Sequence, residues 1–74
     1  MNYEALADLT EVQKQTRDFI VRFRDDRGFP PTLREICDAF DITLTAARDR
    51  LILLERKGII SREPHWPRAI KVLV

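Results

Sequence analysis

Residues 30–58, PPTLREICDAFDITLTAARDRLILLERKG, contain two short helical patterns joined by a three-residue corner. The first pattern opens at Thr32, whose hydroxyl can accept from the backbone N–H of Glu35 while the Glu35 carboxylate reaches back to the N–H of Thr32. The Pro-Pro pair before Thr32 disfavours an earlier helix start. We therefore expect a helix over residues 33–40.

The corner between the two patterns is Asp41-Ile42-Thr43. Aspartate tolerates the left-handed backbone conformation that a sharp helix exit requires, although glycine adopts it at lower cost. Thr43 is placed to cap a second helix over residues 44–57, which Gly58 ends. The residues that recur along it at the spacing of a buried face are Ala47, Leu51 and Leu54.

The first turns of this second helix carry Thr45, Arg48 and Asp49 on a different side from the apolar residues. Two short helices that meet at a tight corner are typical of a helix-turn-helix. Its second helix reads base edges in the major groove of DNA with residues near its amino end. The pattern therefore predicts a DNA-reading surface on the helix that begins near residue 43.

A longer helical pattern precedes this pair. Thr10 with Gln13 repeats the capping signal, and the helix it opens is predicted over residues 11–26, with Gly28 as its exit. Residues 1–8 are expected to be a short tail on one domain over residues 9–74. The side chains predicted to face the interior in these helices and the connection between them are Val12, Thr16, Phe19, Ile20, Phe23, Phe29, Leu33, Ile36, Cys37 and Phe40.

After Gly58 the pattern changes to β-branched residues in two short runs, which predict a β-hairpin over residues 59–73. The segment between the runs carries His65, Trp66 and Arg68. A hairpin behind a helix-turn-helix is a wing, and a polar and aromatic tip can lie against a phosphate backbone or in a minor groove. The predicted fold class is mainly α with a small β-hairpin, a three-helix winged helix-turn-helix.

Charge is distributed unevenly along the chain. The net charge is +1. Residues 1–42 hold six Lys/Arg and nine Asp/Glu, a balance of −3, whereas residues 43–74 hold seven Lys/Arg and three Asp/Glu, a balance of +4. The basic excess lies on the predicted reading helix and the hairpin, which favours double-stranded DNA as the partner.

Composition argues against several other classes of protein. The 74 residues contain no run long enough to span a bilayer and open on polar and acidic residues instead of a secretory signal, which predicts a cytoplasmic, nucleoid-associated protein of a bacterium or phage. One cysteine, Cys37, and one histidine, His65, provide neither a metal cluster nor a nucleophile–base pair. We expect no enzyme activity, no cofactor and no small-molecule ligand.

These residues resemble the amino-terminal DNA-binding domain of the LexA repressors, a winged helix-turn-helix, over roughly Leu9 to Leu73. The resemblance implies a DNA-binding transcriptional regulator, most naturally a repressor. The motifs that carry it are Leu9-Thr10, Gly28-Phe29-Pro30-Pro31-Thr32 with Glu35-Ile36, Ala46-Ala47, Leu51 with Leu54, Arg56-Lys57-Gly58-Ile59-Ile60, and the basic and apolar strand Arg68 to Leu73.

The resemblance also implies which positions read DNA. Family members carry Ser where this chain has Thr43, Asn where it has Thr45, and Glu where it has Arg48 and Asp49. Their corner between the two helices is one residue longer. This sequence therefore keeps the fold but is not expected to read the same operator. The family's repressors continue into a self-cleaving, dimerising peptidase domain that these residues do not show, so autoproteolysis is not expected. The base-reading positions carried over are Thr43, Thr45, Ala46, Arg48 and Asp49.

Individual side chains have simpler alternatives. Arg48 either contacts guanine O6 and N7 or pairs in solvent with Asp49 or Glu55. Thr43 is at least as well explained as a helix cap. The residues predicted to contact the DNA backbone are Thr32, Arg34, Arg62, His65, Arg68 and Lys71.

Leu51 to Leu54 are four consecutive apolar residues, which one helix cannot bury equally against one core. Ile52 and Leu53 therefore either contact a second copy, giving a homodimer on two half-sites, or are covered by the hairpin and tail. Trp66 either caps the hairpin against the core or contacts DNA, and it is a further candidate for contact with a second copy or partner. The alternative function is a winged-helix module that docks another regulator or a polymerase through the same three residues. A DNA binder is expected to place its carboxyl-terminal cations on one face, whereas a docking module scatters them around an apolar patch. The cations concerned are Arg48, Arg62, Arg68 and Lys71.

Overall fold

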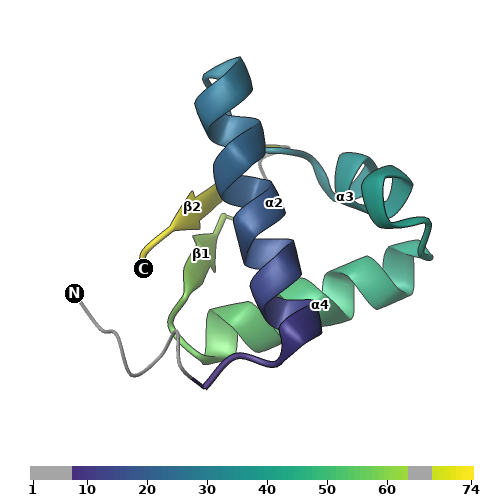
Figure 1. Ribbon diagram of the computed structural model, residues 1–74, viewed down its shortest axis with the longest axis vertical. Coiled ribbons are helices and arrows are strands. Elements are labelled where there is room, and N and C mark those ends of the chain that lie inside the picture. The colour runs from purple at the N-terminus through teal and green to yellow at the C-terminus, as the bar shows by residue number, and fades with distance from the viewer. Residues whose placement is uncertain (1–7, 64–67) are drawn as a thin grey trace.

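The computed structural model describes residues 8–63 and 68–74. Its elements, numbered as in Figure 1, are α2 (Glu11–Arg27), α3 (Leu33–Phe40), α4 (Leu44–Arg56), β1 (Ile60–Arg62) and β2 (Ile70–Val72). In Figure 1, α3 and the hairpin lie to either side of α2, and α4 runs beneath it from the α3 side to the hairpin side. This arrangement confirms the predicted fold class of three helices with a small β-hairpin.

Each helix begins at the threonine that was predicted to cap it. Thr10 Oγ1 accepts from the backbone N–H of Gln13 at 3.2 Å, and Gln13 Oε1 accepts from the N–H of Thr10 at 3.1 Å. Thr32 and Glu35 make the same reciprocal pair at 3.1 and 2.9 Å. Thr43 caps α4 without such a reciprocal pair: its hydroxyl accepts from the backbone N–H of Ala46 at 3.1 Å. These bonds satisfy amide groups that have no partner within the helix, and they fix where each helix starts.

The corner between α3 and α4 turns at Asp41, which has φ 53° and ψ 52° in the left-handed region. The Ile42 N–H then donates to the Cys37 carbonyl at 3.1 Å and closes the end of α3. Three residues separate the two helices, as predicted. The first turn of α4 is therefore held at a fixed angle to α3.

Replacing Asp41 with glycine should raise the free energy of unfolding by up to about 1 kcal/mol, because glycine has no Cβ to strain in the left-handed region. Urea unfolding followed by circular dichroism measures the change. Asp41→Ala is the matched control, since it keeps a Cβ and should not stabilise the protein. Stabilisation by both substitutions would show that the aspartate carboxylate, and not backbone strain, sets the cost at this corner.

The hairpin is antiparallel and short. Ile60 pairs with Val72, Ser61 with Lys71, and Arg62 with Ile70. The predicted strands were longer because β-branched residues continue on both sides of this ladder. The predicted tip residues His65 and Trp66 lie outside the described residues. Because side chains alternate along a strand, Arg62 and Lys71 project from opposite faces of the hairpin.

The core lies where α4 packs against α3, α2 and β1, and where α2 packs against β2. The predicted buried face of α4 is confirmed, and α2 contributes Ile20 together with the buried polar residues Gln13 and Thr16. The helices end within one residue of their predicted ends, at Arg27 and Arg56. The buried apolar residues are Ile20, Ile36, Cys37, Ala47, Leu51, Leu54, Ile59 and Ile60.

Two residues predicted to be internal are exposed. Val12 is 46% exposed because Gln13 takes the inward position in the first turn of α2, where its Oε1 accepts from Lys57 Nζ at 2.8 Å. Phe29 is 41% exposed and packs at the edge of Phe23, with ring centroids 6.1 Å apart. The prediction was wrong at both positions because it relied on hydrophobicity alone. It missed that Gln13 is buried in place of Val12, and that Phe29 joins a cluster of aromatic rings at the surface.

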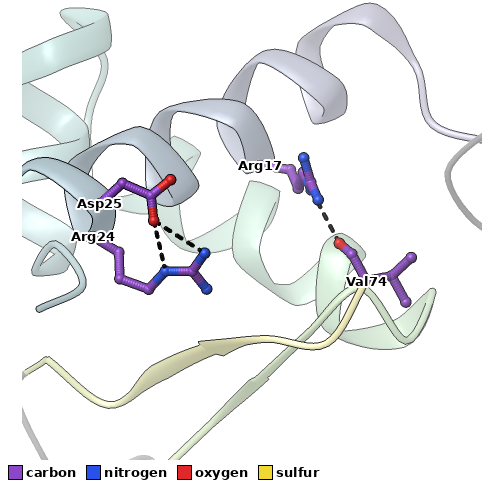
Figure 2. A network of polar contacts seen from close by, with 4 residues as sticks. All are labelled: Arg17, Arg24, Asp25 and Val74. Atoms are coloured by element: carbon purple, nitrogen blue, oxygen red, sulfur yellow. Dashed lines mark hydrogen bonds and ion pairs between the residues drawn. The ribbon is translucent and has the colours of Figure 1, made fainter. Parts of the chain in front are cut away.

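Polar contacts from α2 hold the other elements in place. Arg17 Nε donates to the Val74 carbonyl at 3.0 Å and ties the residues after β2 to α2 (Figure 2). By contrast, Arg24 and Asp25 form an exposed pair of neighbours on α2 itself, at 3.3 Å, which contributes little to stability (Figure 2).

None of the helices in the described ranges is long and apolar enough to cross a membrane.

Candidate nucleic-acid interface

The first two turns of α4 present polar side chains to solvent. Thr43, Thr45, Arg48 and Asp49 are exposed and Ala46 is half-buried, while the opposite side of the helix is in the core. The turn at Asp41 and the Thr43 cap fix where this segment begins. The structure therefore brings together all five residues predicted to read bases.

Arg48 has no ion-pair partner within 4.0 Å among the described residues, so the pairing with Asp49 or Glu55 that the sequence allowed is not formed there. Its neighbour Arg50 behaves differently. The Arg50 guanidinium donates to the buried Thr16 hydroxyl at 3.3 Å and lies over the Phe40 ring at 5.0 Å. Of the two arginines in the first half of α4, Arg48 is therefore the one available to a ligand.

Leu44 is an exposed residue of this surface that the sequence did not identify. Its side chain is 46% exposed at the first position of α4. The spacing from Leu44 to Ala47 and Leu51 is that of the buried face, so periodicity places it in the core. The first turn of α4 extends beyond the packed part of the core, which a periodic pattern does not reveal.

A groove of about 580 Å³ lies between the start of α3, the middle of α4 and the hairpin. Arg48 and Arg62 line it from α4 and β1, and Thr32 lines it from the start of α3. Arg62 Nη2 is 3.4 Å from Glu55 Oε1, at the long end for such a contact, and Arg62 Nε has no hydrogen-bond partner within the described residues. Two cations and a hydroxyl predicted to contact DNA thus share one groove.

The remaining predicted backbone contacts are placed differently. Arg34 is exposed on the first turn of α3. Lys71 is exposed on the face of the hairpin opposite Arg62. Arg68 Nη1 is 2.7 Å from Glu35 Oε1 and donates to the Pro30 carbonyl at 3.0 Å. The four carboxyl-terminal cations therefore do not all lie on one face; Arg48 and Arg62 do.

The pKa of Glu35 lies below its ordinary value of 4.5. The largest cause is the hydrogen bond from the backbone N–H of Thr32, and the Arg68 guanidinium adds to it, while burial acts in the opposite direction. Both partners favour the charged carboxylate. The lowered pKa means that the folded chain binds a proton at Glu35 less readily than the unfolded chain does.

This difference predicts a pH dependence of stability. The contribution of Glu35 is fully present above its ordinary pKa and is lost as pH falls through the lowered pKa of the folded state. Urea midpoints measured from about pH 6 to about pH 3 should therefore fall more steeply for the wild type than for Glu35→Gln. Parallel curves for the two proteins would show that the Glu35 carboxylate contributes nothing to stability.

The described residues define a winged helix-turn-helix domain, with three helices, a tight corner, an exposed polar start of α4 and a hairpin behind it. The sequence model of the LexA DNA binding domain matches residues 6–69, and the chain belongs to this family.

Curated relatives agree with the family match. The chain is 45% identical over 67 residues to the LexA repressor of Thermotoga petrophila. The aligned region covers 90% of this chain and 34% of the relative. It is 41% identical over 68 residues to the LexA repressor of Leptospira interrogans and 43% identical over 68 residues to that of Leptospira biflexa, each covering 92% of this chain and 34% of the relative. The chain thus spans about a third of the length of these relatives.

Proposed function

We propose that this chain is a sequence-specific double-stranded DNA-binding domain of a transcriptional repressor. The proposal rests on the amino-terminal half of α4. One side of this half-helix is polar and exposed to solvent, and the opposite side is buried in the core. Membership of the LexA DNA binding domain family supports the same function. In this proposal α4 enters the major groove and the hairpin lies along the flanking backbone.

Each reading residue has a chemistry suited to base edges. Arg48 donates two hydrogen bonds to guanine O6 and N7, and Asp49 accepts from a cytosine amine. Ala46 and the exposed Leu44 make apolar contact with a thymine methyl group, and Thr45 bonds either kind of edge. These residues differ chemically from one another, so they would select a base sequence and not merely a duplex.

The backbone contacts in this proposal come from the groove and its rim. Arg62 exchanges its long contact with Glu55 for a phosphate, while Thr32 and Arg34 contact phosphates from the start of α3. Lys71, on the outer face of the hairpin, contributes mainly through its charge. These contacts supply affinity without sequence information.

The proposal includes binding as two copies on an operator with two half-sites, because single modules bury little surface on DNA. Leu53, 41% exposed on α4, is the described residue that a second copy would cover. The alternative function, docking of another regulator, needs an apolar patch. Of the three residues predicted to form it, Leu53 is exposed and Ile52 is half-buried, while Trp66 lies outside the described residues. The family match is therefore what favours DNA binding over docking.

Fluorescence anisotropy of a labelled random-sequence duplex at several salt concentrations tests the proposal. Binding should weaken steeply as salt rises, with a slope set by the number of phosphates neutralised. A random pool should then yield an operator that binds more tightly than the random duplex. Absence of binding at low salt would contradict DNA binding and favour the docking function.

The two hairpin cations provide a matched comparison. Arg62→Ala should lower the slope of log affinity against log salt by about one unit, because one phosphate contact is lost. Lys71→Ala removes the same charge from the other face of the same hairpin and should lower the slope by less. A larger change for Lys71→Ala would place the DNA on the outer face of the hairpin.

A further inference from the structure

The Arg68 guanidinium contacts the first turn of α3 and the segment that leads into this helix. It lies 2.7 Å from Glu35 Oε1, donates to the Pro30 carbonyl at 3.0 Å, and stacks over the Phe29 ring with its central carbon 4.4 Å from the centroid. Arg68 precedes β2, so these contacts join the returning side of the hairpin to the start of the helix-turn-helix. Charge, hydrogen bonding and stacking all use one side chain.

Among the residues that the structure describes, the outer end of the hairpin has few other constraints. The ladder holds three residue pairs, and beyond them the Glu63 N–H donates to the Ala69 carbonyl at a long 3.3 Å. A two-stranded hairpin is marginally stable without further packing. The contact from Arg62 to Glu55, at 3.4 Å, is weaker than that from Arg68 to Glu35. Among the described residues, Arg68 therefore makes the closest polar contact that ties this end to the helices.

Glu35 takes part in two interactions at once. Its Oε1 accepts from the backbone N–H of Thr32 at 2.9 Å, which caps α3, and the same atom faces Arg68. Thr32 in turn lines the groove that Arg48 and Arg62 share. The position of the hairpin is thereby coupled to the first turn of α3.

We propose that Arg68 and Glu35 form a latch that holds the outer end of the hairpin against the start of α3, so that Arg62 faces the DNA backbone. Arg68 is then a positioning residue and not the phosphate contact that its charge suggests. This inference rests on the proposed DNA-binding function and specifies how the hairpin is aligned for it. The Glu35 carboxylate and the Pro30 carbonyl both contact Arg68 Nη1 in the free protein.

Glu35→Gln separates the latch from the helix cap. Glutamine can still accept from the Thr32 N–H, as Gln13 does from Thr10 in the equivalent bond of α2. The substitution therefore keeps the cap and removes only the charge that faces Arg68. Because it also makes the protein more positive, simple electrostatics predicts tighter DNA binding, whereas the latch predicts weaker binding.

DNA affinity is measured by anisotropy for wild type, Glu35→Gln, Arg68→Ala and the double variant. The latch predicts that each single variant binds about two- to fivefold more weakly and that the double variant is no weaker than either, because one interaction is lost in all three. The salt slope should change little in Arg68→Ala. Tighter or unchanged binding by Glu35→Gln, together with a slope about 0.9 lower in Arg68→Ala, would instead make Arg68 a phosphate contact.

Amide hydrogen exchange of the free protein tests the latch without DNA. The Glu63 N–H should exchange about two- to fivefold faster in both single variants, while the Ala47 N–H, in the buried part of α4, keeps its rate and excludes global unfolding. An unchanged Glu63 rate in Glu35→Gln overturns the latch whatever the DNA result. If the wild type does not bind DNA at low salt, the proposed function fails, and the exchange rates still decide whether the latch exists.

Discussion

Arg48→Ala is expected to weaken binding to a selected operator by about five- to 150-fold, because a bidentate arginine–guanine contact is worth about 1–3 kcal/mol. Arg48 is exposed on the first half of α4 and forms no ion pair within the described residues. The loss should be much smaller on a random duplex, where only charge is removed. Anisotropy titrations with the two duplexes measure both values.

Arg56→Ala is the matched control for this prediction. Arg56 is an exposed arginine in the last turn of the same helix, far from the reading residues. Its substitution removes the same charge and should reduce operator affinity only slightly. Equal losses for the two variants would show that Arg48 acts through net charge and reads no base.

Leu54→Ala is expected to lower the free energy of unfolding by about 2–5 kcal/mol, the usual cost of removing a fully buried leucine side chain. Leu54 is fully buried, on the face of α4 that packs against the other elements. A domain of this size has little stability to lose, so a substantial fraction of the variant should be unfolded at room temperature. Urea unfolding followed by circular dichroism measures the change.

Leu53→Ala provides the comparison. Leu53 is the preceding residue on α4 and is 41% exposed, so its truncation should change stability by about 0.5 kcal/mol or less. The two substitutions delete the same atoms from the same helix. A loss for Leu53→Ala as large as that for Leu54→Ala, and growing with protein concentration, would show that a second copy buries Leu53 and stabilises the fold.

The features predicted well from the sequence are local ones. The caps at Thr10, Thr32 and Thr43 and the left-handed turn at Asp41 each depend on side chains and backbone within a few residues. Such interactions are visible in the order of residues because their partners lie three or four positions away. The helix starts, the corner and the polar start of α4 followed from them.

The features that were missed depend on contacts between distant segments. The contact between Arg68 and Glu35 joins positions that are far apart in sequence, so the sequence did not reveal this partner of Arg68. Leu44 matches the spacing of the buried face but lies beyond the packed part of the core. Arg62 and Lys71 are both cations of the hairpin, and only the strand register places them on opposite faces.

A titration of ¹⁵N-labelled protein with a short duplex shows whether DNA lies against the start of α4 and the groove beside it. We expect the largest amide shifts over residues 43–49 and around Arg62, with small changes on the exposed side of α2 near Arg24 and Asp25. Shifts concentrated on α2, or no shifts at low salt, would contradict this placement of the DNA.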